Sequence, residues 1–229
     1  MGSFFQIAID GPVAAGKSSV ARELAKKLDF VYVDTGAMYR AVTLKALDNG
    51  IAIGNEDELV QLVRGMEIDV RAPFSDEKDG RLSTVLMDGR DVSWEIRTPR
   101  VSEAVATVAG LPRVREVLVE KQRKIALLRK VVMEGRDITY VVLPEADLKI
   151  YLTANEKVRI ERYFQMLSAK DSKITRLEAR QILKDRDELD ITREASPLRI
   201  VKDAWVLDTS EMNIEEVVQI IAEKVGGLS

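Results

Sequence analysis

Residues 11–18 of the chain, Gly-Pro-Val-Ala-Ala-Gly-Lys-Ser, match the pattern G-x-x-x-x-G-K-[ST] of phosphate-binding loops. Glycine lets successive backbone N–H groups approach phosphate oxygens, and the helix that follows such a loop adds the positive end of its dipole. We expect Lys17, at a solvent-facing position, to neutralise the β- and γ-phosphates of a nucleoside triphosphate, and Ser18 to ligate Mg²⁺. The predicted triphosphate site comprises Gly11, Pro12, Val13, Ala14, Ala15, Gly16, Lys17, Ser18 and Ser19.

The residues on either side of this loop support the interpretation. The apolar residues 4–9 run into Asp10-Gly11 and predict a buried strand, and residues 17–28 have helical spacing. A loop between a strand and a helix is the context in which the pattern binds phosphate, so a chance glycine turn is disfavoured. The chain contains no Asn-Lys-x-Asp segment, with which switch GTPases recognise guanine.

Asp34 follows a second apolar stretch, residues 30–33, which predicts another buried strand. In other enzymes with this loop, an aspartate that ends such a strand belongs to the magnesium shell, and Asp34 would reach the ion through a water molecule. Asp34 also precedes a helical pattern, and aspartate is a favoured N-cap residue. The sequence leaves both roles open.

The composition limits the chemistry that is available. The 229 residues include no cysteine and no histidine, which excludes thiolate nucleophiles, imidazole bases and cysteine-ligated zinc. Carboxylates, lysine, arginine and Mg²⁺ suffice for phosphoryl transfer. With 35 basic and 38 acidic residues, the net charge of −3 provides no positive field for nucleic-acid polymers. We find no apolar segment long enough for a secretory signal or a membrane span, so we expect a cytoplasmic protein.

Four further segments carry a family resemblance when they are taken together and in order. They are Asp34-Thr35-Gly36-Ala37-Met38-Tyr39-Arg40, Pro112-Arg113-Val114-Arg115, Gly135-Arg136-Asp137, and residues 186–193, which are followed by Ser196-Pro197-Leu198. They resemble the D-[ST]-G-x-x-Y-R, P-x-V-R, G-R-D and R-D-x-x-D-x-x-R elements of bacterial cytidylate kinases. The resemblance spans nearly the whole chain and implies transfer of the γ-phosphate of ATP to CMP or dCMP, with Mg²⁺ as cofactor.

A nucleoside monophosphate offers a phosphate dianion, a ribose diol and a base edge, and each needs its own partner. Guanidinium forks suit the phosphate, and carboxylate and guanidinium groups suit the sugar and the base. The resemblance assigns the phosphate to Arg40, Arg136 and Arg193, the sugar to Asp190 and Arg186 with Thr35 and Tyr39 nearby, and the cytosine to Asp137 and Arg115. For any single one of these arginines, the alternative to a role in substrate binding is a solvated ion pair at the surface.

Arg159 and Arg162 are spaced three residues apart in a predicted helix and therefore lie on one face. The resemblance implies a helical lid that closes over ATP and brings arginine to the transferring phosphoryl group, where Arg159 and Arg162 would act with Lys17. The alternative is surface ion pairing with Glu156 or Glu161.

Two departures from the family pattern concern the acceptor site. Thr139-Tyr140 stands where relatives have Gly-Thr, and a β-branched residue does not readily adopt a positive φ, so we expect the backbone near Asp137 to differ. Ala106 stands where the family has a serine that faces the base. We expect water or Thr107 to replace that contact.

The remaining patterns predict the elements that must position these residues. Apolar residues at helical spacing mark the segments 38–47, 55–64, 98–109, 112–128, 155–166, 175–190 and 214–225. Strands are expected at 67–71, 81–87, 131–133, 149–152 and 204–207. Turn-forming residues at 75–80 indicate a small antiparallel insertion, and the polar residues 168–173 indicate a hinge.

Strands that alternate with helices favour an α/β fold with a parallel sheet. With the resemblance, this predicts a three-layer phosphate-loop fold, a small β-containing insertion that binds the monophosphate, and a helical lid. We expect a single domain over residues 1–229, with a core of about 1–34, 98–154 and 191–229, a monophosphate-binding part of about 35–97, and a lid with flanking helices of about 155–190.

Two other functions remain open at this point. A kinase of the same chemistry would act on another acceptor, such as UMP, AMP or a small metabolite like shikimate. A nucleotide-dependent switch protein is less consistent with the dense arginines of the acceptor side. We expect ATP and CMP or dCMP as partners of a monomer that binds neither nucleic-acid polymers nor membranes.

Overall fold

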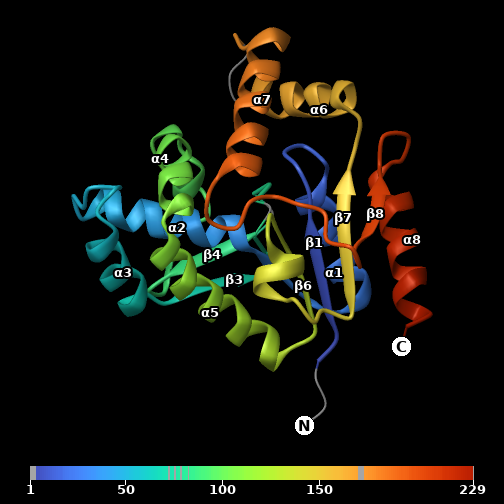
Figure 1. The fold of residues 1–229 in the computed structure, drawn as a ribbon, viewed down its shortest axis with the longest axis horizontal. Coiled ribbons are helices and arrows are strands. Elements are labelled where there is room, and N and C mark those ends of the chain that lie inside the picture. The colour runs from blue at the N-terminus through green and yellow to red at the C-terminus, as the bar shows by residue number, and fades with distance from the viewer. Residues whose placement is uncertain are drawn as a thin grey trace.

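The computed structural model describes residues 4–71, 73–74, 76–77, 79–81, 83–169 and 173–228. Its centre is a five-stranded sheet in the order β2-β6-β1-β7-β8, in which every neighbouring pair is parallel (Figure 1). The strands are β1 (Gln6–Asp10), β2 (Val31–Asp34), β6 (Val131–Gly135), β7 (Leu148–Thr153) and β8 (Trp205–Asp208). Parallel strands end at one edge, and the register pairs Asp10 with Gly135 and Asp34 with Glu134 there.

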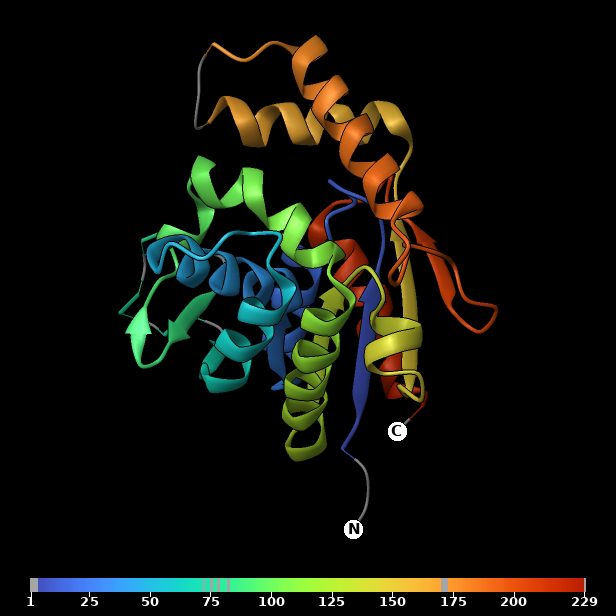
Figure 2. The ribbon, with the colours of Figure 1, turned by 60° about the vertical axis from the view of Figure 1, so that its left-hand side comes forward.

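Alternate residues of the strands face opposite layers of helices, as the period of two along a strand requires. One face packs against α1 (Lys17–Leu28) and α8 (Ile214–Gly226), and the other against α2 (Thr35–Asp48) and α5 (Pro112–Leu128). The strand residues toward α1 and α8 include Ile7, Ile9 and Val132, and those toward α2 and α5 include Ala8, Val33 and Met133. Figures 1 and 2 show the resulting three layers, which confirm the predicted fold class.

The other long helices begin at residues that suit a helix start. Asn55 caps α3 (Glu56–Gly65), and Asn155 caps α6 (Glu156–Ser168). Thr175 and Asn213 form capping boxes at the starts of α7 (Arg176–Thr192) and α8. α4 (Pro99–Gly110) and α5 carry proline in their first turns, as predicted for Pro112.

The predicted antiparallel insertion is confirmed. It comprises β3 (Ile68–Arg71), β4 (Thr84–Met87) and β5 (Arg90–Asp91), and it continues into the short helix η1 (Glu95–Arg97). β5 and η1 are too short to leave a pattern in the sequence. Residues 75, 78 and 82, which belong to the predicted turn and strand, lie outside the described residues.

α6 and α7 form a hairpin beyond the carboxyl ends of the central strands, at the top of Figure 2. A small apolar group joins this hairpin to the phosphate loop, because Val13 packs with Tyr163, Ala179 and Leu183. Residues 170–172 of the predicted hinge lie outside the described residues.

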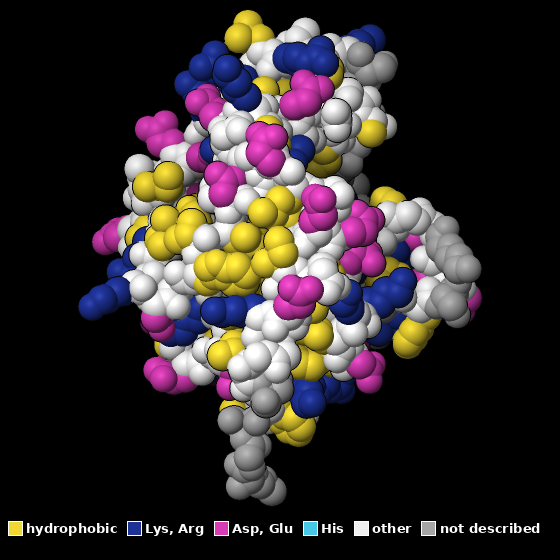
Figure 3. Space-filling model, turned by 90° about the vertical axis from the view of Figure 1, so that its right-hand side faces the viewer, with side chains coloured by type: hydrophobic (Ala, Val, Ile, Leu, Met, Phe, Trp, Pro, Cys, Tyr) yellow, Lys and Arg dark blue, Asp and Glu magenta, His cyan; other side chains and the backbone are white. Residues whose placement is uncertain are grey.

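The structure adds features that the sequence did not predict. β6 continues beyond residue 133 to Gly135, and one π-helical turn, η2 (Ile138–Val142), follows it. β8 is the edge strand on the side of the molecule seen in Figure 3, where hydrophobic side chains gather among charged ones. Among the described residues, no helix combines the length and the apolar character that a bilayer crossing needs.

Candidate active site

The loop after β1 has the backbone conformation of a phosphate cradle. A Cβ atom at Gly11 would lie 2.0 Å from the carbonyl oxygen of Leu152, so the loop can approach β7 only with glycine at this position. Gly16 directly precedes α1 and has a φ of +94°, which L side chains rarely adopt. The N-terminus of α1 therefore opens toward the loop, where its N–H groups and its dipole favour an anion.

The structure corrects the expectation that Lys17 faces solvent. Lys17 is only 5% exposed, and its Nζ donates a hydrogen bond to the Pro12 carbonyl at 2.8 Å. Burial, together with the charge of Arg136, lowers the pKa of Lys17 to about 7, while the charges of Glu134 and nearby aspartates oppose the shift. A phosphate beside this ammonium group would favour its charged form.

Glu134, at the end of β6, is a functional candidate that the sequence reasoning missed. Its carboxyl group is buried and accepts a hydrogen bond from the Tyr32 hydroxyl at 3.2 Å, and the nearby Ser18 side chain acts to lower its pKa. Its backbone carbonyl accepts one from the Thr35 hydroxyl at 2.8 Å. Burial raises the pKa of Glu134, and the charge of Asp34 raises it further. An acid at the carboxyl end of a strand beside β1 was the available signal, but the predicted strand ended one residue earlier.

Asp34 caps α2, because its Oδ1 accepts a hydrogen bond from the Ala37 N–H at 2.9 Å. Its Oδ2 lies 3.6 Å from a terminal nitrogen of Arg97, a second residue that the sequence reasoning missed. Arg97 comes from η1, so this ion pair joins the insertion to the central sheet. The cap and a role in a magnesium shell are compatible, because they use different oxygens.

The oxygen donors beside the loop fit a magnesium ion. The Ser18 side chain and the charge of Asp34 both act on the carboxyl group of Glu134. The described part of the chain contains no group of three histidine, cysteine, aspartate or glutamate side chains that would form a metal cage. Mg²⁺ is usually held by one or two protein groups together with substrate phosphates and water. The donor set therefore suits an ion that binds with the nucleotide.

Three residues predicted for the acceptor side form one buried group. Arg115 pairs with Asp137, and their side chains are 5% and 7% exposed. Arg115 also donates a hydrogen bond to the Ala109 carbonyl at 2.8 Å, and its guanidinium lies 5.3 Å from the ring centroid of Tyr39. A guanidinium and a carboxylate side by side can offer donors and an acceptor to the edge of a base.

A second predicted group contains Arg136, Asp190 and Arg193. The Nε of Arg136 donates to Asp190 at 2.6 Å, and a terminal nitrogen of Arg193 lies 3.9 Å from the other oxygen of Asp190. The Nε of Arg193 donates to the Ser196 carbonyl at 2.7 Å, while its buried Nη2 has no partner among the described residues. Burial lowers the pKa of Arg193, and the charge of Arg115 lowers it further. A desolvated free donor of this kind suits a phosphate oxygen.

Arg40 and Arg186 lie nearer the insertion and the lid. Arg40 donates to the Ser102 hydroxyl at 2.9 Å, and Arg186 donates to the Tyr163 hydroxyl at 3.3 Å. Burial, together with the charges of Arg186 and Arg97, lowers the pKa of Arg40 to about 10. Two cations that act on the guanidinium of Arg40 create a place for an anion.

The two lid arginines have different surroundings. Arg159 reaches the phosphate loop, where it donates to the Val13 carbonyl at 3.1 Å and to Asp187 at 2.6 Å. Asp187 also accepts a hydrogen bond from the Val13 N–H at 3.2 Å. Arg162 points instead to Thr209, after β8, and donates to its hydroxyl at 3.1 Å and its carbonyl at 2.8 Å.

The alternative of surface ion pairs with Glu156 and Glu161 is therefore wrong for Arg159 and Arg162. The two glutamates face α7, where Glu156 lies 3.7 Å from Arg180 and Glu161 lies 2.9 Å from Arg176. The structure brings Arg159 to the loop and leaves Arg162 at the end of β8.

The departures from the family pattern have local explanations. Thr139 is the second residue of the π-helical turn η2 and has no positive φ, and its N–H and hydroxyl donate to Asp10 at 2.8 and 2.6 Å. The Ile138 N–H donates to the same carboxyl group at 2.9 Å. Asp10 thus fixes the backbone that follows Asp137. Ala106 lies on an exposed face of α4.

Together these contacts form a continuous series from the phosphate loop to the Arg115–Asp137 pair. The charges of Arg136 and Asp190 act on Lys17, Asp190 contacts Arg193, and the charges of Arg115 and Asp137 act on Arg193. Such a series can hold two phosphate groups close together and a base beyond them. Alignment and electrostatic stabilisation would then suffice for transfer.

Comparisons with known proteins agree with this geometry. The model of the family described as cytidylate kinase matches residues 7–226. A cytidylate kinase of Carboxydothermus hydrogenoformans is 49% identical over 222 residues, which cover 96% of this chain and 97% of that protein. A cytidylate kinase of Caldanaerobacter subterraneus subsp. tengcongensis is 46% identical, with 96% and 94% covered. Among solved structures, an uncharacterized protein from Eubacterium ventriosum has a TM-score of 0.53 at 12% identity, with 97% and 98% covered, which concerns the fold alone.

Proposed function

Because the chain belongs to the cytidylate kinase family, we propose that it transfers the γ-phosphoryl group of ATP to CMP and dCMP. The observation that carries the proposal is the buried Arg115–Asp137 pair, which the acceptor-side arginines connect to the phosphate loop. The loop accounts for a triphosphate donor, and the pair accounts for an acceptor whose base presents donors and acceptors together.

On the donor side, the loop residues 11–19 hold the triphosphate, and Lys17 neutralises its β- and γ-phosphates. Ser18 and Glu134 would hold Mg²⁺, with Asp34 acting through water. Magnesium, when bound, neutralises charge on the phosphate oxygens. The effects of Ser18 and Lys17 on the buried carboxyl group of Glu134 support this assignment, because they show that these groups lie near one another.

On the acceptor side, the monophosphate is held by Arg40, Arg136 and Arg193. The sugar is held by Asp190 and Arg186, with Thr35 and Tyr39 nearby. The cytosine is held by Arg115 and Asp137. An oxygen of the acceptor phosphate attacks the γ-phosphorus of ATP, and the bond to the β-phosphate oxygen breaks, so that ADP leaves. No general base is needed, because the attacking oxygen is already ionised.

The α6–α7 hairpin is the proposed lid, with Arg159 and Arg162 as catalytic arginines. The contact of Arg159 with the Val13 carbonyl supports its role, and Arg162 would have to leave Thr209 to reach the donor. We retain one domain with a core, a monophosphate-binding part at about 35–97 and a lid at about 155–190, in a monomer.

A coupled assay of ADP release tests the proposal. Purified protein receives Mg-ATP and, in separate reactions, CMP, dCMP, UMP, AMP or shikimate. We expect CMP and dCMP to stimulate ADP release far more than the other acceptors. A stronger response to another acceptor would leave the transfer chemistry and change the substrate. Hydrolysis that no acceptor stimulates would favour a switch protein.

A further inference from the structure

The turn after α7 determines where Arg193 points. The Leu198 N–H donates to the Asp190 carbonyl at 2.7 Å, and the Arg193 Nε donates to the Ser196 carbonyl at 2.7 Å. Ser196 has a φ of +53°, which is uncommon for a residue other than glycine. Because the Nε of Arg193 is bound to this turn, a shift of the turn would move the other guanidinium nitrogens with it.

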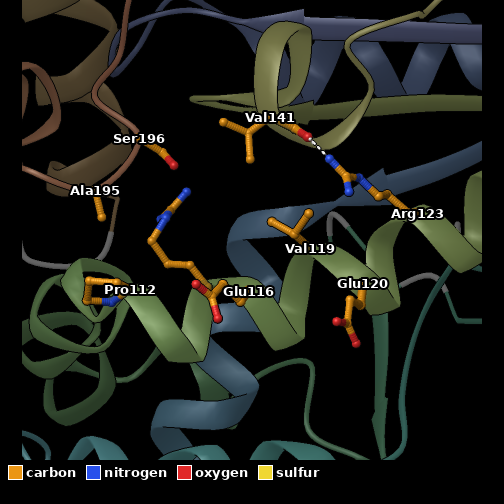
Figure 4. A pocket seen from close by; sticks show the side chains of 9 residues that line it. Pro112, Glu116, Val119, Glu120, Arg123, Val141, Ala195 and Ser196 are labelled. Carbon is orange, nitrogen blue, oxygen red and sulfur yellow. Dashed lines mark hydrogen bonds between the residues drawn. The ribbon is translucent and has the colours of Figure 1, made fainter.

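The turn borders a cavity of about 390 Å³. Figure 4 shows that Ala195 and Ser196 lie on one wall of the cavity, Val141 of η2 on another, and Val119 of α5 opposite. Packing against Ala195 and Ser196 is therefore incomplete, and contacts elsewhere must hold the turn in place.

Tyr140 of η2 supplies such contacts. Its hydroxyl donates a hydrogen bond to the Pro197 carbonyl, and the guanidinium of Arg199 lies 4.0 Å from its ring centroid. η2 is itself anchored, because the carboxyl group of Asp10 accepts hydrogen bonds from its first two N–H groups. Asp137 immediately precedes η2. Tyr140 thus connects the fixed backbone next to Asp137 with the turn that holds Arg193.

We propose that Tyr140, together with Arg199, is a positioning residue for the acceptor phosphate. It holds the Nη2 of Arg193, which has no partner among the described residues, at a fixed position relative to Arg136 and to the Arg115–Asp137 pair. This inference rests on the proposed transfer to CMP. Small displacements of a group that aligns two reactants have large effects on transfer, so a contact remote from the phosphates can matter for catalysis.

The test measures CMP binding by calorimetry and both KM values in the ADP-release assay. Tyr140→Phe removes the hydroxyl and keeps the ring, so we expect the Kd and KM for CMP to rise about two- to tenfold, the effect of one net hydrogen bond. Arg199→Ala removes an exposed cation from the ring, and we expect a rise of about two- to fivefold. The KM for ATP should stay within about twofold in both variants.

A double-variant comparison separates positioning from a merely structural role. If Tyr140 acts through Arg193, Tyr140→Phe should have no further effect on CMP binding in an Arg193→Ala background. The matched control is Lys224→Ala, which removes a cation 5.7 Å from the ring centroid of Trp205, and we expect it to leave CMP binding unchanged.

Three results would overturn the inference. In the first, Tyr140→Phe lowers the melting temperature and leaves CMP binding unchanged. In the second, its effect on CMP binding persists in full without Arg193. In the third, Tyr140→Phe does not fold and Arg199→Ala binds CMP as the wild type does. Failure of the wild type to bind CMP would instead contradict the proposed function itself.

Discussion

Asp137→Asn removes the charge of one member of the buried ion pair and keeps the shape of its side chain. Arg115 then remains as a cation with a 5% exposed side chain and, within the described part of the chain, no counter-ion at hydrogen-bond distance. Breaking a buried pair in this way costs about 3–5 kcal/mol of unfolding free energy, because the remaining charge stays desolvated.

The surroundings of Arg115 place the expected loss at the lower end of that range. Its hydrogen bond to the Ala109 carbonyl and its contact with the Tyr39 ring do not depend on Asp137. We therefore expect a loss of about 3 kcal/mol. For a chain of this length, each kcal/mol lowers the melting temperature by about 2–4 °C, so the fall should be about 6–12 °C.

Urea denaturation and calorimetry of the substrate-free protein measure these changes. Asp57→Asn is the matched control, because Asp57 pairs with Arg113 at the surface, with side chains 81% and 53% exposed, and should change stability by less than about 0.5 kcal/mol. The double variant Arg115→Met with Asp137→Leu removes both charges and should be more stable than Asp137→Asn alone. An unfolding free energy of Asp137→Asn within about 1 kcal/mol of the wild-type value would refute the reasoning, because the expected desolvation cost would then be absent.

Three further predictions concern activity. Lys17→Met should lower kcat/KM at least about 10²-fold by removing positive charge from the transferring phosphates; activity within about threefold of wild type would contradict the loop assignment. Arg193→Ala should raise the KM for CMP and lower kcat with little change in the KM for ATP, and weakened ATP binding alone would move Arg193 to the donor side. If neither water nor Thr107 replaces the missing contact, Ala106→Ser should lower the KM for CMP by about two- to tenfold and leave the KM for UMP unaffected. A negligible gain for CMP would indicate that water already bridges there, and equal shifts for CMP and UMP would show that position 106 does not face the base.

The parts of the site that depend on neighbouring residues were predictable from the sequence. The phosphate loop combines its glycines, Lys17 and Ser18 in one short segment between a strand and a helix, so local pattern was enough. The caps at Asn55 and Thr175 likewise follow from residue type and from the helical patterns after them. The acceptor residues required the family resemblance, because their segments are far apart in the chain.

Features that depend on packing between distant segments were not predictable. The burial of Lys17 depends on how the loop, β6 and α7 meet, and a motif contains no information on that contact. Glu134 could be recognised only once β6 was known to run to Gly135 beside β1. Arg97 reaches Asp34 across 63 positions of the sequence, and Arg162 reaches Thr209 across 47. η2 was missed because a single π-helical turn has no periodicity to detect.

The most direct test of the central claim is the ratio of kcat/KM for CMP to kcat/KM for UMP, in wild type and in Asp137→Asn, below the unfolding temperature of the variant. The claim is that the buried Arg115–Asp137 pair recognises cytosine. A hydrogen bond to a charged group contributes about 1.5–3 kcal/mol, so the ratio should fall at least about tenfold, through a loss for CMP. An unchanged ratio, with both acceptors reduced equally, would contradict the account.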